Sequence, residues 1–208
     1  KAAVLYRKQA RFQLITTGKI SQKRLLFEDQ HLERLTKASR YFAYPFDPEE
    51  LRQKIEEECQ ACDSHQDYRL RISLSKSGEM ELSRQVLTPL SPTFCKAKLC
   101  LQEADLNQAF TYFKTTHRPH LSLGKQEIIY HNAAGELLET SIGNLVLKIA
   151  GKLYTPPTSL GILPGIYRQY LLERGQVEEK VLTLKDLAQA EAIYGCNAVR
   201  GLYELEVI

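Results

Sequence analysis

The amino-terminal part of the chain combines strand-like and helix-like hydrophobic patterns. FQLITT, residues 12–17, is rich in β-branched and aromatic residues and is followed by a glycine, which predicts a strand. In HLERLTKASRYFAY, residues 31–44, apolar or small residues recur at helical spacing, at Leu32, Leu35, Ser39 and Phe42. We therefore expect a helix over this stretch, with Asp29 as its N-cap.

A second helix and a pair of strands follow. The sequence DPEEL predicts a helix start, because Asp47 can act as the cap and Pro48 suits the first helical position. We expect this helix to run to about Cys62. DYRLRISLS, residues 67–75, alternates cleanly and places Arg69 and Arg71 on one face of a strand. Lys76, Ser77 and Gly78 then form a turn, and EMELSRQVL returns as a second strand.

The segment TPLSP, residues 88–92, is the best candidate for a linker, because it holds two prolines in five residues. Beyond it the pattern is dominated by strands, at 95–102, across 127–157 and in the last part of the chain. One helix is predicted between Pro164 and Gly175, and a shorter one with Thr183 as its cap. The resulting prediction is an α+β protein with two domains, a small one over 1–88 and a larger strand-rich one over 92–208.

Composition narrows the class of protein. The chain has 208 residues, of which 43% are hydrophobic and 25% charged, which is typical of a soluble globular protein. Its net charge of +3 is small and its basic residues are scattered, so we expect no nucleic-acid partner and no anionic membrane surface. The sequence holds no apolar run long enough to span a membrane.

The cysteines indicate a reducing compartment. There are five of them, an odd number in a chain of this size, which argues against a disulfide scaffold. Cys59 and Cys62 form a CxxC on the second predicted helix, but no second pair completes a zinc site, so we expect no metal. No signal peptide is visible, and free thiols favour a cytoplasmic location. The chain starts at Lys1 rather than at methionine, which is typical of a piece of a longer polypeptide.

Two residues are candidates for chemistry. Lys114 lies in FKTTHRP, among aromatic and β-branched residues. It is either a solvated lysine at a strand end or a partly buried amine, which would lose its proton more easily because burial disfavours the charged form. Glu139 lies on the strand-like run LLETSIGN, where a carboxylate has to be exposed or paired.

Two segments can offer backbone amides to an anion. LPGIYR places Gly165, Ile166 and Tyr167 at a helix N-terminus, which suits a phosphate. The turn around Asn197 can offer more amides and a side-chain amide. Each of these features alone is generic. An amine, a carboxylate for a ring nitrogen and a phosphate cradle together are what pyridoxal phosphate requires of a protein.

The order of the motifs resembles that of the fold-type IV pyridoxal-phosphate enzymes, from about residue 12 to the end. This family includes branched-chain aminotransferase, D-amino-acid aminotransferase and aminodeoxychorismate lyase. The matching segments are HLERL, FKTTHRP, NAAGELLETSIGNLVL, LYTPPTSLGILPGIYR and AEAIYGCNAVRGL. HLERLTKASRYFAYPF and KTTHR are most similar to aminodeoxychorismate lyase, especially to lyase domains fused behind a 4-amino-4-deoxychorismate synthase component.

The resemblance implies a role for each matching residue. Lys114 would bind pyridoxal 5′-phosphate covalently and then move protons as acid and base. Glu139 would pair with the pyridine nitrogen. Arg34 of HLERL would reach the cofactor phosphate, and the backbone amides of Ile166 and Tyr167 would hold it.

The resemblance also implies a further phosphate contact and a substrate site. Asn197 matches a phosphate-contacting position that usually carries a hydroxyl residue. Arg71 or Lys76 would bind a substrate carboxylate, and Arg118 would bind the substrate or shape the site. In such enzymes the cofactor lies in the cleft between the domains of a homodimer, so we expect a homodimer that acts on a small molecule, fused to or partnered with a synthase component.

Three functions follow from these expectations. The leading one is a 4-amino-4-deoxychorismate lyase that releases pyruvate and 4-aminobenzoate, a step of folate synthesis. The second is an aminotransferase of the branched-chain or D-amino-acid type, which would use the same residues. The third is an interaction or regulatory domain without turnover, because the segment between Lys114 and Glu139 is short for the family and Tyr167 stands where threonine is common.

Overall fold

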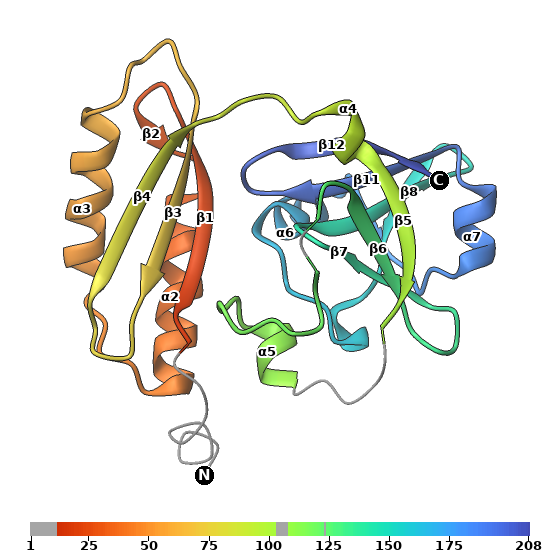
Figure 1. Cartoon of the computed structure of the whole chain (residues 1–208), viewed down its shortest axis with the longest axis horizontal. Helices are drawn as coiled ribbons and strands as arrows, with labels where there is room; N and C mark the ends of the chain where they lie inside the picture. The colour runs from red at the N-terminus through yellow and green to blue at the C-terminus, as the bar shows by residue number, and fades with distance from the viewer. Residues whose placement is uncertain (1–11, 103–107, 123) are drawn as a thin grey trace. The chain divides into compact units, whose positions relative to one another are not determined.

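The computed structural model describes residues 12–102, 108–122 and 124–208, which divide into two compact units (Figure 1). The first unit extends to Thr88 and also includes the segment Phe113–His117. The second unit consists of Pro89–Tyr112 and Arg118–Ile208. The chain therefore changes unit within TPLSP, and it returns briefly to the first unit at the segment that carries Lys114.

The first unit is a four-stranded antiparallel sheet with two helices. Its strands follow the order β2-β1-β3-β4. These elements are β1 (Leu14–Ser21), β2 (Arg24–Leu25), α2 (Glu28–Phe42), α3 (Pro48–Gln60), β3 (Tyr68–Leu74) and β4 (Met80–Val86). Both helices pack on the sheet, α2 against β1 and α3 against β2 and β4 (Figure 1). The alternation predicted for residues 67–75 is confirmed, since Leu70 and Ile72 are fully buried while Arg69 and Arg71 are half-buried.

The two helix starts of this unit differ in how well local sequence predicts them. Asp47 caps α3 as expected, because its Oδ1 accepts hydrogen bonds from the amides of Glu49 and Glu50, and Pro48 occupies the first position. The prediction for Asp29 is wrong. The cap of α2 is Phe27, in the left-handed region with φ 59°, so Asp29 lies in the first turn. The tight β1–β2 hairpin delivers the chain to the helix earlier than expected.

The second unit is built on a sheet of eight strands in the order β10-β9-β8-β11-β12-β5-β6-β7. These strands are β5 (Lys96–Leu101), β6 (Glu127–His131), β7 (Leu137–Thr140), β8 (Asn144–Ile149), β9 (Lys152–Thr155), β10 (Glu178–Glu179), β11 (Ala192–Asn197) and β12 (Gly201–Val207). Because β7 also pairs with β8, at Glu139 and Asn144, the strands from β8 to β7 close into a ring. Apolar side chains from the ring strands form one core, including Ala97, Ile129, Leu137, Leu145 and Leu205.

The helices of the second unit are short. They are α4 (Pro92–Cys95), α5 (Gln108–Tyr112), α6 (Ile166–Glu173), α7 (Leu184–Gln189) and the 3₁₀ turn η1 (Thr158–Leu160). The cap predicted at Thr183 is confirmed as a capping box with Asp186. The sequence did not indicate α4, α5, η1 or β10, since pieces of two to five residues are too short to show a period.

None of the helices among the described residues is both long enough and apolar enough to cross a membrane. The same part of the chain holds no group of three or more His, Cys, Asp or Glu side chains that could bind a metal ion.

Candidate active site

Lys114 is held by strand pairing within the first unit. Its carbonyl oxygen accepts a hydrogen bond from the Ile15 amide at 2.9 Å, and the Thr116 amide donates to the Gln13 carbonyl at 2.9 Å. Thr115, between them, bridges to Leu14 and is 1% exposed. Because side chains alternate along an extended segment, burial of Thr115 directs Lys114 to the opposite side, where it is half-buried. Lys114 thus precedes an isolated β-bridge between Thr115 and Leu14, the first residue of β1.

Arg34 and Lys114 both lie close enough to His31 to affect its pKa. His31 precedes Arg34 by one turn on α2. The His31 ring is fully buried, and its Nδ1 lies 2.6 Å from the Thr16 Oγ1 on β1. Burial, together with the positive charges of Arg34 and Lys114, lowers the pKa of His31 to about 3. A neutral imidazole is therefore buried near Lys114 and Arg34, the two cationic side chains that are predicted to bind the cofactor.

Gly18 makes room for this histidine. A Cβ at Gly18 would lie 2.6 Å from the His31 Nε2 and 2.7 Å from the Leu25 Cδ1. A larger residue in the middle of β1 would therefore push α2 away from the sheet. The position of Arg34 depends on this close approach, because Arg34 follows His31 by one turn on the same helix.

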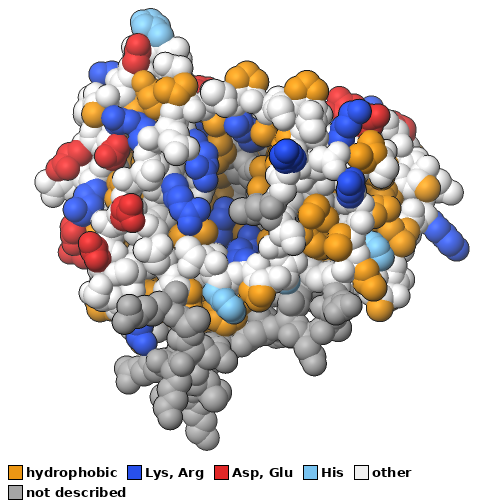
Figure 2. Space-filling view, viewed as in Figure 1, with side chains coloured by type: hydrophobic (Ala, Val, Ile, Leu, Met, Phe, Trp, Pro, Cys, Tyr) orange, Lys and Arg blue, Asp and Glu red, His pale blue; other side chains and the backbone are white. Residues whose placement is uncertain are grey.

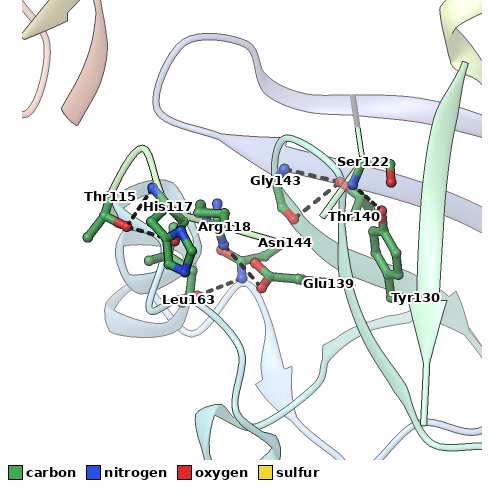
Figure 3. A network of polar contacts seen from close by, with 10 residues as sticks. All are labelled: Thr115, His117, Arg118, Ser122, Tyr130, Glu139, Thr140, Gly143, Asn144 and Leu163. Carbon is green, nitrogen blue, oxygen red and sulfur yellow. Dashed lines mark hydrogen bonds and ion pairs between the residues drawn. The ribbon is translucent and has the colours of Figure 1, made fainter. Parts of the chain in front are cut away.

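In the second unit Glu139 is buried on β7 and faces Arg118 (Figure 3). The Arg118 Nη2 lies 3.3 Å from the Glu139 Oε1, with 15% and 4% of the two side chains exposed. The carboxylate expected to hold a pyridine nitrogen thus already contacts a guanidinium. The Nε of Arg118 is buried and has no hydrogen-bond partner among the described residues.

Asn144 connects the Glu139 strand to the start of α6. It lies opposite Glu139 in the β7–β8 pair, and its Nδ2 donates to the Leu163 carbonyl at 2.8 Å (Figure 3). A Cβ at Gly165 would lie only 1.9 Å from the Asn144 Oδ1. Glycine is therefore required where the LPG turn passes over this side chain.

The predicted phosphate cradle is the N-terminus of α6. Gly165 is its N-cap, and a glycine has no side chain with which to cap the helix. The first amides of a helix point out of its N-terminus and favour an anion. Ile166 is buried, whereas Tyr167 is half-buried and its ring centroid lies 5.5 Å from that of Tyr170, with the two rings tilted by 34°.

Asn197 is engaged in the β11–β12 turn. Its Oδ1 accepts from the amides of Val199 and Arg200, at 3.0 and 2.9 Å, and its Nδ2 donates to the Ile142 carbonyl at 3.3 Å. The side chain thus shapes the turn and ties it to the residues that follow Glu139. A phosphate contact by Asn197 stays a prediction.

The candidates for a substrate carboxylate lie in different surroundings. Arg71 is in the middle of β3, opposite Thr17 on β1 and Ser83 on β4, on the face that carries no helix. Lys76 is exposed in the β3–β4 turn. Figure 2 shows acidic side chains gathered over α3 and Lys and Arg side chains over the neighbouring strands of this unit. The surface over these strands is therefore electrostatically more favourable to an anion than the surface over α3.

The structure distributes the predicted residues over both units. Lys114, Arg34, Arg71 and Lys76 belong to the first unit, and the others to the second. Sequence reasoning assigned no role to His31 or Asn144. Two features of the sequence could have indicated them, because His31 precedes Arg34 by one helical turn and Asn144 ends the ETSIGN motif. Histidine and asparagine are not by themselves evidence of a buried hydrogen bond.

The α+β architecture agrees with the fold-type IV prediction. The chain belongs to the family described as amino-transferase class IV, whose sequence profile matches residues 13–208. The solved structure of a candidate amino-acid aminotransferase from Mesorhizobium loti superposes with a TM-score of 0.81 at 27% identity, covering 95% of this chain and 100% of that one.

Two further relatives are lyases by name. The chain is 26% identical over 187 residues to aminodeoxychorismate lyase from Saccharomyces cerevisiae, covering 64% of this chain and 50% of that protein. A candidate 4-amino-4-deoxychorismate lyase from Haemophilus somnus 129PT has the same fold, with a TM-score of 0.72, 24% identity and coverage of 93% of this chain and 100% of that one. The chain spans half or less of the length of the curated relatives that it matches.

Proposed function

We propose that this chain is a pyridoxal-phosphate-dependent 4-amino-4-deoxychorismate lyase. The observation that carries the proposal is Arg118, four residues after Lys114, against Glu139 at 3.3 Å. This lysine–arginine spacing is shared with lyase-like members of the family, and the similarity to the Saccharomyces cerevisiae lyase supports the same reading.

The residues present fit the cofactor. Glu139 offers a buried carboxylate for the ring nitrogen, and α6 offers an N-terminus that begins at a glycine with no room for a Cβ. Arg118 has a buried Nε that lacks a partner among the described residues, which suits an acceptor on a bound molecule. Arg34 and the α6 amides would neutralise a phosphate.

Bound pyridoxal phosphate supplies an electron sink for the carbon that bears the substrate nitrogen. The Nζ of Lys114 would hold the cofactor aldehyde, then take the proton from that carbon and deliver a proton to the departing enolpyruvyl group. Glu139 would keep the ring nitrogen protonated. Arg71, Lys76 and Arg118 would orient the substrate carboxylates. The products pyruvate and 4-aminobenzoate balance the substrate atom for atom, so no water is consumed.

The test begins with cofactor uptake. The purified protein is mixed with pyridoxal phosphate, its visible spectrum is recorded, and borohydride is added before peptide mapping. We expect a visible band that borohydride removes, with the label on the peptide that contains Lys114. A Lys114→Ala variant should lose the label, whereas Lys125→Ala, which changes an exposed lysine, should keep it.

The second step is the reaction itself. With 4-amino-4-deoxychorismate the wild-type protein should release equal amounts of pyruvate and 4-aminobenzoate, and Lys114→Ala should lose at least about a thousandfold in rate, as expected when an acid–base and covalent group is removed. Equal turnover by Lys114→Ala would overturn the assignment of Lys114.

An aminotransferase is the second candidate, because the Mesorhizobium loti structure covers nearly the whole chain at 27% identity. This function predicts a different product. The cofactor would leave the half-reaction in its amino form, and a 2-oxo acid would restore it. Amino transfer without release of 4-aminobenzoate would favour this candidate, and label on Lys114 without either reaction would favour a domain that has lost turnover.

A further inference from the structure

A buried carboxylate outside the predicted site holds the residues that follow Glu139. Glu127, the first residue of β6, is 0% exposed. Its Oε1 accepts a short hydrogen bond from the Ser141 hydroxyl, and its Oε2 accepts from the Tyr203 hydroxyl at 2.9 Å. A buried polar group is costly unless it is hydrogen-bonded, and these two donors satisfy both oxygens of the Glu127 carboxyl group.

Ser141 belongs to the turn that joins β7 to β8, which we call the 140–144 turn. Ser141 is tied to β6 by two more bonds, since its amide donates to the Ile128 carbonyl at 3.0 Å and its Oγ accepts from the Ile128 amide at 3.0 Å. Thr140 and Gly143 close the turn, with the Thr140 amide donating to the Gly143 carbonyl at 2.9 Å (Figure 3).

The 140–144 turn is connected to Glu139, to Asn197 and to the segment that leads into α6. Glu139 precedes it directly. The Ile142 carbonyl accepts from Asn197 of the β11–β12 turn, and Asn144 donates to the Leu163 carbonyl just before α6. A shift of this turn would therefore move the ring-nitrogen carboxylate and the phosphate cradle together.

The Tyr203 side chain is tightly packed against β11 and the 140–144 turn. A Cβ at Gly195 would lie 2.4 Å from the Tyr203 ring, and a Cβ at Gly143 would lie 2.5 Å from the Cys196 carbonyl and 3.1 Å from the Tyr203 hydroxyl. Gly195 on β11 and Gly143 in the 140–144 turn thus leave space around one phenol. The Tyr203 hydroxyl donates to Glu127, and burial together with that negative charge raises its pKa well above its ordinary value.

We propose that Glu127 is a positioning residue of the cofactor site, which acts through Ser141 to hold the 140–144 turn and with it Glu139 and the start of α6. The proposal rests on the proposed function for the identity of the cofactor. Glu127 touches neither Glu139 nor α6 itself in any contact described above, and its influence on them passes through the turn.

The test compares Glu127→Gln with Glu204→Gln, a matched change at an exposed glutamate on β12. Hydrogen exchange is measured first on the protein without cofactor. In Glu127→Gln we expect amide exchange in residues 140–144 and 163–167 to accelerate at least about tenfold, as for one lost hydrogen bond to a charged group. Exchange elsewhere, and everywhere in Glu204→Gln, should match the wild type.

Cofactor binding is the second readout. At a temperature where both proteins are folded, the dissociation constant of pyridoxal phosphate should rise at least about tenfold in Glu127→Gln, and the visible band of the bound cofactor should shift. A merely structural role would lower the melting temperature and leave the band and the affinity of the folded protein unchanged. That result, or unchanged exchange in residues 140–144, would overturn the proposal.

Ser141→Ala provides a second route should Glu127→Gln fold poorly. It keeps Glu127 bonded to Tyr203 and removes the hydroxyl that donates to Glu127 and accepts from the Ile128 amide, so it should accelerate exchange in the same residues. The double variant should exchange no faster than Ser141→Ala alone, and additive effects would contradict action through Ser141. If the wild-type protein takes up no pyridoxal phosphate, the proposed function fails, whereas the exchange measurement still decides whether Glu127 holds the turn.

Discussion

At the scale of single residues, Arg118 and Glu139 form a largely buried ion pair in the second unit. The two side chains are 15% and 4% exposed and lie 3.3 Å apart. Removing one partner of a buried ion pair is costly because the remaining charge stays desolvated, whereas removing both is far less costly.

We therefore predict strong coupling between these two residues. Arg118→Gln should lower the free energy of unfolding by about 3 kcal/mol, and Arg118→Gln with Glu139→Gln should recover most of that loss. Urea unfolding of the two single variants and the double variant, without cofactor, measures the coupling.

The exposed pair of Lys148 and Glu191, 3.5 Å apart with 41% and 45% exposed, provides the control. Its double-mutant cycle should give less than about 1 kcal/mol, because solvent screens exposed charges. Equal coupling energies in the two cycles would contradict the view that Arg118 and Glu139 form a desolvated unit.

The sequence identified these two residues but not their relation. Lys114 and Glu139 follow from the order of the motifs, and Arg118 was expected at the substrate or the wall of the site. Which carboxylate a buried arginine contacts depends on how a loop residue and a strand residue, 21 positions apart along the chain, are brought together. No local pattern encodes that choice.

At the scale of elements, the contact between α2 and β1 carries a buried histidine whose protonation opposes folding. The pKa of His31 is lowered from 6.5 to about 3 in the folded protein. Below pH 6.5 His31 is protonated in the unfolded chain but stays neutral in the folded protein. This group therefore makes the free energy of unfolding decrease as the pH falls from 6.5 toward 3.

We predict that His31→Gln removes this part of the acid sensitivity. Between pH 7 and pH 4.5 the wild-type protein should lose about 3 kcal/mol more free energy of unfolding than His31→Gln, which is the proton linkage over two pH units. Urea unfolding at both pH values gives the difference. His65→Gln, at an exposed position, should lose as much as the wild type, and a His31→Gln protein with wild-type acid sensitivity would refute the prediction.

The elements themselves were predictable where side chain and backbone interact within a few residues. The caps at Asp47 and Thr183 and the alternation in β3 are of this kind. The start of α2 was not, because Phe27 adopts a left-handed conformation at the end of a hairpin and takes the position that Asp29 would otherwise fill. Hairpin geometry overrode the local capping preference.

At the scale of the whole molecule, residues 113–117 belong to the first unit although the residues on both sides belong to the second. The two hydrogen bonds to Gln13 and Ile15 attach them to β1. The first unit is therefore completed by a segment that follows it in sequence by more than twenty residues.

We predict that breaking this attachment loosens the first unit selectively. Thr116→Pro removes the amide that donates to the Gln13 carbonyl, at a cost of about 3 kcal/mol. Thr116→Ala keeps that amide and loses only the Thr116 Oγ1 that accepts from the Gln13 amide at an exposed position, so its effect should be smaller. Hydrogen exchange should accelerate in β1 and α2 in the proline variant and stay unchanged in β8 and β11. Equal acceleration in both units would show that the segment does not belong to the first one.

The sequence by itself determined the family and the local elements, because motif order, helix caps and alternation depend on residues close together in the chain. The tertiary structure alone decided the closure of the strand ring at Glu139 and Asn144, the attachment of Lys114 to β1 and the network around Glu127. The attachment of Lys114 and the network around Glu127 depend on hydrogen-bond partners far away in sequence, and the closure depends on the pairing of all the other ring strands. Serine, asparagine and glycine at such positions resemble ordinary loop residues until the fold brings their partners within hydrogen-bonding distance.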